Sequence, residues 1–384
     1  MKSESPFVKL AGSDRIPVPG ARAMAAADPE QWLEVTLKLR RRAPLPEVAA
    51  PAPRRWSREE LQDQFGADPQ VVARIEDVFT SLGLAVLASC AGTRSVKLGG
   101  PVKTMEAAFH VKLMKFQHAT HGDYRGRVGA VHVPIAVAAD VEAVFGLDDR
   151  RAVRRRPGAR KLLSSVAHGT HASKRPWFFP AELATAYDFP PGDGAGQVIG
   201  VLEFGGGFFP GDLAAFVQQA GLPATANVIP ISVDHAPTDA QDEAVGEVML
   251  DIEAIAGVCP KATVPVYFAQ FTEKGWVDVL DAAVHDTTHR PQVLSVSWGY
   301  AEDAYIWTQA AMDQVDEALK ESALLGITVC VAAGDDGSSD GITDGHAHVD
   351  FPCSSPYVLA VGGTLLRLAG SRRTERAWKD GDGL

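Results

Sequence analysis

Between residues 198 and 361, almost continuously apolar runs alternate with stretches of helical periodicity, a pattern that few folds accommodate. Strands that are apolar on both faces are typical of parallel sheets, because helices cover such sheets on both sides. The predicted strands are Val198–Phe204, Thr263–Ala269, Val293–Trp298, Thr328–Ala333 and Tyr357–Val361. The predicted helices are Pro210–Ala220, Gln241–Val258, Gly275–His285 and Asp303–Leu325. This half of the chain is therefore predicted to be an α/β domain with helices on both faces of a parallel sheet.

The first half of the chain has a more mixed pattern. Gln31–Leu39 alternates apolar and polar residues as a strand does, and Ser57 with Glu60 forms the capping box of a helix start. Helices are predicted over Val102–Phe109 and over Pro134–Phe145, the second opened by its proline. This mixture favours a small α+β domain with helices on one face of an antiparallel sheet.

The 384 residues are long for one domain, and the stretch 150–175 marks the boundary. It is polar, basic and without periodicity, which is typical of an exposed linker open to proteases. We therefore divide the chain into residues 1–150, a basic linker over 151–175, and residues 176–384. A cleavage site is expected within about residues 165–176 of this exposed linker.

Charge separates the two halves. Residues 1–175 hold 28 basic and 18 acidic residues, a net charge of +10, and the remainder carries −21. Two bodies of opposite charge attract, and we expect protonation of the carboxylates below about pH 4.5 to weaken that attraction. Nucleic acid is the alternative partner, but the arginines gather in linkers without interleaved aromatic residues, so we predict none. No apolar run is long enough to span a membrane, and no signal peptide is readable at the N-terminus.

Three predicted strands end in residues that could carry chemistry. The first closes on Glu203 before a run of three glycines, the third on Trp298, and the fourth is followed by Asp335. Ligands of open α/β sheets bind beyond the carboxyl ends of the strands, so these side chains are expected on one rim. Acids of ordinary loops and caps are the alternative interpretation.

The helix predicted over Gln241–Val258 carries two acids at helical spacing. Glu247 and Asp251 lie four residues apart on one face, and Asp251 falls within the apolar stripe. One interpretation is that both are paired with basic groups at the edge of the stripe. The other is a coupled acid pair that shares a proton, with one carboxylate acting as general base.

Other motifs are weaker. His285 and His289 have the HxxxH spacing, but Asp286 stands where zinc peptidases have glutamate, so both are predicted to be surface residues. The segment Asp344–Asp350 could bind a metal but is better explained as a polar loop. No GxSxG motif occurs.

A series of longer motifs appears in order along the chain. They are YDFP at 187–190, VLEFGGG at 201–207, GEVMLDIE at 246–253, SVSWG at 295–299, AAGD at 332–335 and FPCSSPYV at 351–358. The series resembles the sedolisin family of serine-carboxyl peptidases, and most of all its kumamolisin-type bacterial members. The resemblance covers essentially the whole chain.

The resemblance implies a subtilisin-like fold preceded by a small α+β, ferredoxin-like propeptide that acts as intramolecular inhibitor or folding chaperone. It implies an acid-acting endopeptidase whose substrates are proteins or peptides and which is exported from the cell. Glu247 matches the general base, Asp251 the acid that orients it, and Asp335 the oxyanion donor. Glu203 and Trp298 match residues that extend the hydrogen-bond network behind the triad.

Two parts of the family pattern are not found in these 384 residues. The nucleophilic serine, in a Gly-Thr-Ser segment, and the calcium ligands are expected beyond Leu384, so no nucleophile and no metal ligand is assigned in this chain. Asp336 stands where the family usually has serine. The alternative to an enzyme is an inert remnant whose first domain serves as an inhibitor or chaperone.

Overall fold

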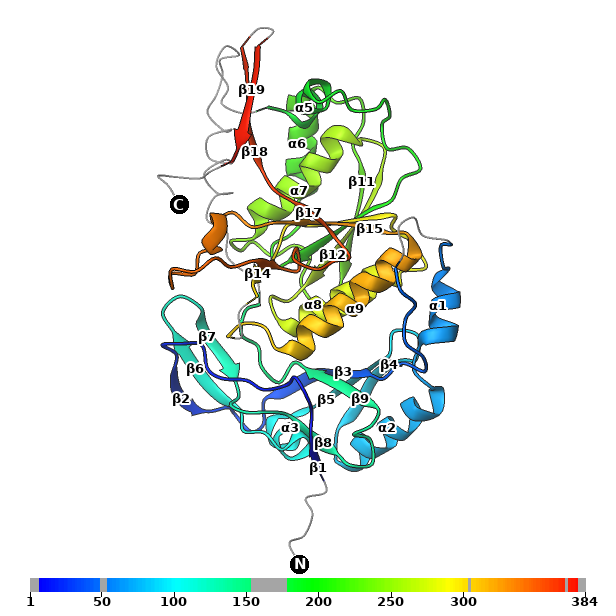
Figure 1. Ribbon diagram of the computed structural model, residues 1–384, viewed down its shortest axis with the longest axis vertical. Helices are drawn as coiled ribbons and strands as arrows, with labels where there is room; N and C mark the ends of the chain where they lie inside the picture. The colour runs from blue at the N-terminus through cyan, green and yellow to red at the C-terminus, as the bar shows by residue number, and fades with distance from the viewer. Residues whose placement is uncertain (1–6, 49–53, 153–177, 303–304, 370–371, 379–384) are drawn as a thin grey trace, which may run out of the picture.

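The computed structural model describes residues 7–48, 54–152, 178–302, 305–369 and 372–378 in two domains (Figure 1). We call the described residues up to 152 the N-domain and those from 178 onwards the C-domain. Of the predicted linker over 151–175, residues 151 and 152 are described, whereas the rest of it and the expected cleavage site lie outside the described residues. The predicted domain boundaries stay a prediction.

The C-domain is built on a six-stranded parallel sheet, as predicted, with the strand order β11-β12-β10-β13-β15-β17. Its strands are β10 (Ile199–Phe204), β11 (Asn227–Ser232), β12 (Thr263–Ala269), β13 (Val293–Val296), β15 (Thr328–Ala332) and β17 (Leu359–Val361). Strand β11 was not predicted. It is an edge strand whose residues are exposed or half-buried, so it lacks the apolar run that identified the others.

Helices cover both faces of this sheet, which confirms the α/β class. Val201 of β10 packs with α6 and α7 on one face, and Leu202 packs with α8 and α9 on the other. The helices are α5 (Pro180–Ala186), α6 (Pro210–Ala220), α7 (Val245–Val258), α8 (Glu273–Val284) and α9 (Gln309–Leu325). Helix α9 begins later than predicted because Thr308 caps it by accepting a hydrogen bond from Ala311 N.

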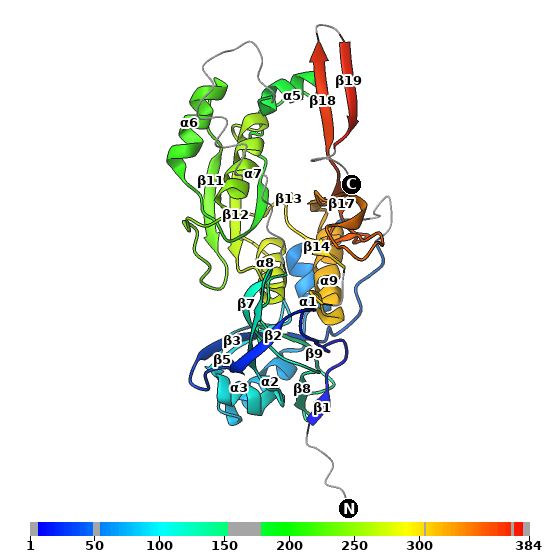
Figure 2. The same ribbon diagram turned by 90° about the vertical axis from the view of Figure 1, so that its left-hand side faces the viewer.

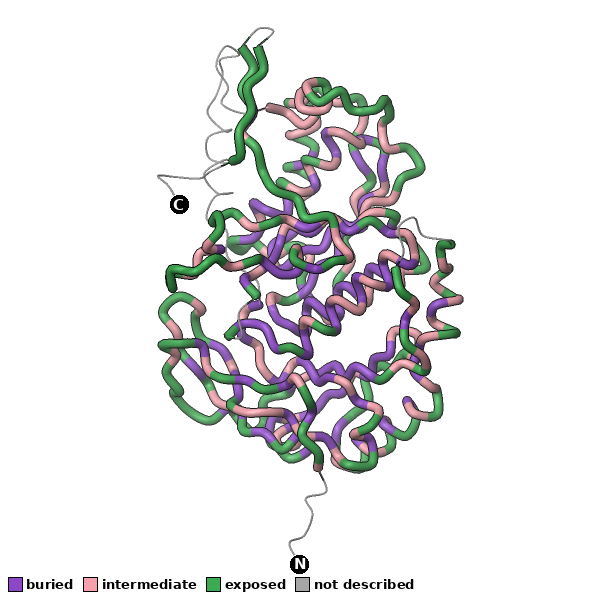
Figure 3. The backbone as a smooth tube through the Cα atoms, viewed as in Figure 1, coloured by how far each residue is buried: buried purple, intermediate pink, exposed green. Residues whose placement is uncertain are grey.

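Smaller elements complete the C-domain. They are β14 (Tyr300–Ala301), the 3₁₀ turn Gly337–Ser339, β16 (Asp350–Phe351), β18 (Thr364–Ala369) and β19 (Arg372–Ala377). The hairpin of β18 and β19 projects from the body of the domain and is mostly exposed (Figures 1 and 3).

The N-domain holds an antiparallel sheet of order β4-β5-β3-β9, with helices packed on one face as predicted. Its strands are β1 (Phe7–Lys9), β2 (Arg22–Ala26), β3 (Trp32–Leu39), β4 (Ala85–Cys90), β5 (Ser95–Pro101), β6 (Met114–His118), β7 (Gly122–Gly126), β8 (His132–Pro134) and β9 (Val141–Phe145). Its helices are α1 (Arg58–Phe65), α2 (Pro69–Ser81) and α3 (Val102–Phe109). The capping box of Ser57 and Glu60 is confirmed at the start of α1.

The helix predicted over Pro134–Phe145 is wrong. Pro134 ends β8, a turn follows, and Val141–Phe145 forms β9, which pairs with Thr36–Leu39 of β3. Pairing with a strand that lies a hundred residues earlier overrides the local pattern, as is common for short apolar runs.

The two faces of β3 pack against different domains. Leu33, Val35 and Leu37 enter the core of the N-domain. On the opposite face, the hydroxyl of Thr36 donates to Asp278 Oδ2 of α8 at 2.9 Å. The N-domain sheet therefore lies between its own helices and the helices α8 and α9 of the C-domain, and the buried residues run across this junction (Figures 1, 2 and 3).

Among the described residues, no helix combines the length and apolar character that crossing a membrane requires.

Candidate active site

Glu203 stands near the carboxyl end of β10 and is fully buried. Side chains alternate along a strand, so Glu203 lies on the same face as Val201, the face covered by α7. The indole Nε1–H of Trp298, which is also buried, donates to Glu203 Oε2 at 2.8 Å. The sequence-predicted pair of Glu203 and Trp298 is thus in direct contact.

Helix α7 adds two more carboxyl groups. Glu247 lies buried in its first turn, and Asp251 follows one turn later, half-buried. Burial raises the pKa of Glu203 well above its usual range, and the nearby carboxylates of Asp251 and then Glu247 raise it further. The structure therefore gathers Glu203, Glu247 and Asp251 in one buried group, which we call the carboxyl cluster.

The turn after Glu203 requires glycine at two positions for steric reasons. Gly205 and Gly206 have φ angles of +73° and +66°. A Cβ on Gly205 would stand 2.3 Å from the Phe271 ring, and one on Gly206 would stand 2.7 Å from Val248. Only glycine tolerates both the left-handed backbone and this close approach, so the turn packs directly against α7.

Asp242 joins this turn to α7. Its Oδ1 accepts hydrogen bonds from Gly206 N at 3.0 Å and from Ala244 N at 2.8 Å. Helix α7 was predicted to begin at Gln241 but begins at Val245, because the segment before it, including Asp242, instead bonds to the glycine turn. Phe208 N also donates to Thr238 O of this segment. The segment that carries Glu203 and the helix that carries Glu247 are thereby tied together.

Asp335 occupies a different part of the same rim. It follows β15, which β13 separates from β10 in the sheet, and its side chain is exposed. Gly334, with a φ of +83°, turns the chain just before it. The structure thus places Asp335 on the predicted edge but outside the buried group of carboxyls.

Ion pairs join basic side chains of the N-domain to acidic side chains of the C-domain. Arg15 pairs with Glu273 at 2.5 Å, and both side chains are buried. Further pairs of the same polarity are Lys38 with Asp281, Arg41 with Glu317 and Glu321, Lys97 with Asp234 and Asp278, and Arg151 with Glu243. The expected attraction of unlike charges therefore takes the form of specific pairs.

His285 was predicted to lie on the surface, and this is wrong. Its side chain is 6% exposed, and its Nε2 lies 2.6 Å from Glu321 Oε2. Its Nδ1 lies 3.3 Å from Gln62 Nε2 of the N-domain. The N-domain buries His285 at the domain junction, which the local sequence could not show. His289 lies at the half-buried edge, 2.7 Å from Asp286.

No three side chains of His, Cys, Asp or Glu are placed to hold a metal ion within the described part of the chain. In the segment Asp344–Asp350, His348 instead pairs with Asp344 at 2.9 Å. The described residues do not fit the calcium that the family resemblance implies, and no catalytic step is assigned to that ion.

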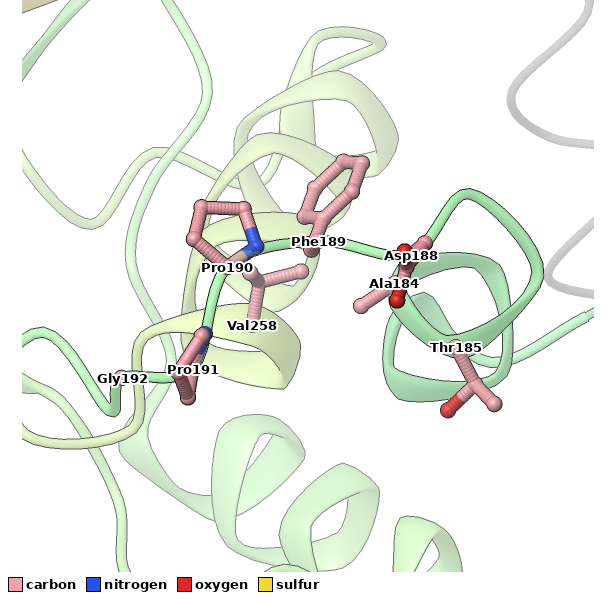
Figure 4. A pocket seen from close by; sticks show the side chains of 8 residues that line it. All are labelled: Ala184, Thr185, Asp188, Phe189, Pro190, Pro191, Gly192 and Val258. Atoms are coloured by element: carbon pink, nitrogen blue, oxygen red, sulfur yellow. The ribbon is translucent and has the colours of Figure 1, made fainter.

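A surface hollow of about 250 Å³ lies between α5 and the end of α7 (Figure 4). Phe189, Pro190, Pro191 and Val258 line much of it, and Asp188 is its one ionisable side chain. None of the residues of the carboxyl cluster lines this hollow, so we assign it no part in the chemistry.

Sequence reasoning missed the residues that surround the site and the junction. Arg15, Asp242 and Phe271 carry no motif of their own. The alternation of β3 did contain a signal, since Thr36 and Lys38 share the face opposite the apolar residues and are both buried. A buried polar stripe on a strand predicts a polar partner surface.

Comparison with known proteins identifies relatives of both domains. Residues 25–150 match the family described as "Pro-kumamolisin, activation domain", and residues 236–377 match the "Subtilase family". Kumamolisin of Bacillus sp. (strain MN-32) is 38% identical over 395 residues, covering 99% of this chain and 71% of kumamolisin. Tripeptidyl-peptidase sed5 of Aspergillus fumigatus is 26% identical, and the match covers 97% of this chain and 69% of that protein.

Among solved structures, the Pseudomonas sedolisin (serine-carboxyl proteinase) complexed with pseudo-iodotyrostatin is 26% identical. The match has a TM-score of 0.48 and covers 54% of this chain and 60% of that one. The decisive finding is the identity to kumamolisin along nearly the whole chain, together with an activation domain at its start. The chain belongs to the sedolisin family of serine-carboxyl peptidases, as a kumamolisin-like proenzyme with a subtilisin-like fold.

Proposed function

We propose that this chain is the larger part of an acid-acting endopeptidase zymogen that cleaves peptide bonds by acyl transfer. Glu247 is the general base, Asp251 orients it, and Asp335 donates to the developing oxyanion. The observation that carries the proposal is the buried carboxyl cluster, in which Trp298 holds Glu203 behind the two acids of α7.

The chemistry follows from the kind of groups present. The nucleophilic serine, which we place beyond residue 384, would pass its proton to Glu247 as it attacks the substrate carbonyl. A carboxylate base remains ionised in acid, where an imidazole would already be protonated. A carboxylic acid at Asp335 can donate a hydrogen bond to the oxyanion, whereas a carboxylate cannot.

The N-domain fits the part of an intramolecular inhibitor. It covers α8 and α9, and its last described residues reach the edge of the carboxyl cluster, where Ala152 N donates to Phe271 O at 2.8 Å. The last described residues of the N-domain therefore lie against Phe271, whose ring packs on the Trp298 that holds Glu203. Calcium dependence and export from the cell remain expectations of the resemblance.

The test compares the chain of 384 residues with one extended by the coding sequence that follows Leu384. We expect no hydrolysis of an unstructured protein at pH 4 by the shorter chain, and hydrolysis by the longer one once a Gly-Thr-Ser segment is included. In the extended chain, Glu247→Gln should lower kcat by about 10²-fold or more.

Glu253→Gln is the matched control for that variant. Glu253 lies on the same helix, and burial together with Asp212 raises its pKa to about 7, yet it is assigned no catalytic role. Equal losses in both variants would contradict the assignment of Glu247. An extended chain that folds but never hydrolyses a peptide would favour the inert inhibitor or chaperone.

A further inference from the structure

Arg151, close to the end of the N-domain, is held by two side chains of the C-domain. Its guanidinium carbon stands 3.8 Å from the centroid of the Phe271 ring. Its NH1 lies 3.1 Å from Glu243 Oε1. A flat cation over an aromatic face with a carboxylate at its edge is the arrangement that recognises an arginine side chain.

Main-chain bonds to the next residue set the position of this arginine. Ala152 N donates to Phe271 O at 2.8 Å, and Ala152 O accepts from the indole Nε1–H of Trp276 at 2.9 Å. Any peptide in the same extended path can make these two bonds, because they involve no side chain of the bound segment. Among the described contacts, those of Phe271 and Glu243 reach the side chain and can select between peptides.

Both of these residues adjoin the carboxyl cluster. The Phe271 ring packs edge-on against Trp298 with centroids 5.9 Å apart, and Trp298 holds Glu203. Glu243 precedes Glu247 by four residues, just before α7 begins. Contacts thus run from the Arg151 side chain through Phe271 and Trp298 to Glu203 of the carboxyl cluster.

We propose that Phe271 and Glu243 form a subsite for an arginine side chain of a peptide substrate, which Arg151 fills until the N-domain leaves. The proposal rests on the peptidase function proposed above. The Glu243 side chain is still 43% exposed with Arg151 in place, so the subsite opens to solvent once Arg151 is gone. Lysine fits it less well, since it lacks the planar face that stacks on the ring.

The test uses the full chain and requires no turnover. Arg151→Ala empties the subsite, and N-acetyl-arginyl-alaninamide is then titrated to 50 mM while the indole N–H signal of Trp298 is followed by NMR. We expect a saturable shift with a Kd on the order of 10 mM. The unsubstituted chain should bind at least tenfold more weakly, because its own Arg151 occupies the site.

Two second substitutions locate the binding. Adding Phe271→Ala to Arg151→Ala should weaken binding about fivefold, and adding Glu243→Gln about threefold, from the loss of the cation–π contact or the ion pair. Glu243 is on the surface, so its variant tests the proposal even if Phe271→Ala fails to fold. The citrulline analogue of the peptide is the control for charge and should not bind.

Equal binding of the arginine and citrulline peptides, or no binding to the Arg151→Ala chain, would overturn the subsite and leave Arg151 as a domain contact only. Peptidase activity is measured separately, in the extended chain. Failure of the subsite and failure of the peptidase function are therefore distinguished.

Discussion

Two groups of buried carboxyls in this molecule behave in opposite ways. At the domain junction, burial alone would raise the pKa of Glu321, but His285 and Arg41 outweigh it and hold the pKa well below its usual range. In the carboxyl cluster, burial and the neighbouring carboxylate of Asp251 both raise the pKa of Glu203. Both side chains are almost fully removed from water.

The difference teaches that burial raises the pKa of an acid unless cationic neighbours outweigh it, as they do at Glu321. The junction opposes Glu321 and Asp234 with cationic side chains, which lower the pKa of both acids and favour the ion pairs that hold the two domains together. The cluster places carboxyl groups beside one another and beside a neutral indole, so the pKa of Glu203 is raised. A raised pKa close to the proposed catalytic groups is useful to acid–base chemistry, and an ionised pair is useful to docking.

The largest effect is expected from breaking a buried pair at the junction. Arg15→Ala leaves Glu273 buried without its guanidinium partner, which should cost about 3 kcal/mol of the free energy of unfolding at pH 7. Urea denaturation measures this change in the free energy of unfolding. The control is Arg40→Ala, since Arg40 is 61% exposed and 3.8 Å from Glu142, and should change stability by less than about 0.5 kcal/mol. Similar small losses in both variants would show that the junction pairs act like surface pairs.

Removing an ionisable group from the carboxyl cluster should change stability in the opposite direction. Glu203→Gln keeps an acceptor for Trp298 and removes the group whose pKa is raised on folding, so it should stabilise the fold at pH 7. The gain should shrink towards pH 4, where the unfolded state also binds the proton. Thermal unfolding at the two pH values measures this, and Glu47→Gln, at a side chain 92% exposed, is the control. Destabilisation at pH 7 would mean that the cluster needs the charge.

A smaller loss of stability is expected when the hydrogen bonds that Asp242 makes beside the carboxyl cluster are removed. Asp242→Ala removes two acceptor bonds and should destabilise the fold by about 1 kcal/mol, whereas Asp242→Asn keeps the acceptor oxygen and should cost less. Chemical denaturation compares the two. An equal loss in both variants would assign the effect to the charge of Asp242.

The smallest change is expected in the contact between the two domains when only the pH is lowered from 7 to 4.5. A group with a lowered pKa gives stability that is lost only as pH falls through that lowered value, so Glu321 and Asp234 stay ionised throughout this range. Asp278, whose pKa burial raises to about 7 despite Lys274, gains its proton here, which favours the folded state as pH falls. Acid separation of the domains therefore belongs well below the pH 4.5 expected from ordinary carboxyl groups.

Small-angle scattering of the full chain tests this last expectation. The radius of gyration should be the same at pH 7 and pH 4.5 and should increase only nearer pH 3. Addition of 1 M NaCl at pH 7 should leave it unchanged, because buried pairs are screened far less than exposed ones. Expansion already at pH 4.5 would show that the junction behaves as a sum of unshifted charges.

Local patterns predicted much of the fold and part of the site. Val102–Phe109 and Thr263–Ala269 have the predicted bounds because their periodicity and flanking turns agree. Glu203, Glu247 and Asp251 were found as candidates from strand ends and helical spacing, and the structure gathers them. Their catalytic roles stay a prediction.

What failed depended on contacts between distant parts of the chain. The strand at Val141–Phe145 exists because β3 pairs with it, and His285 is buried because the N-domain covers it. Net charge was also a coarse guide, since residues 1–150 contain 20 basic and 18 acidic residues and the remaining excess lies in the linker. The positions of Arg15, Lys38 and Lys97, more than their number, make the junction.

Because the two faces of β3 pack against different domains, one face is covered later than the other during synthesis. All strands of the N-domain sheet lie before residue 146, so the sheet can close while α8 is still to be made. At about 5–20 residues per second, roughly 7–30 s pass before α8 and the loop after it are complete. During that interval the face bearing Thr36 and Lys38 lacks its partner helices, and its polar side chains make exposure to water less costly than an apolar face would.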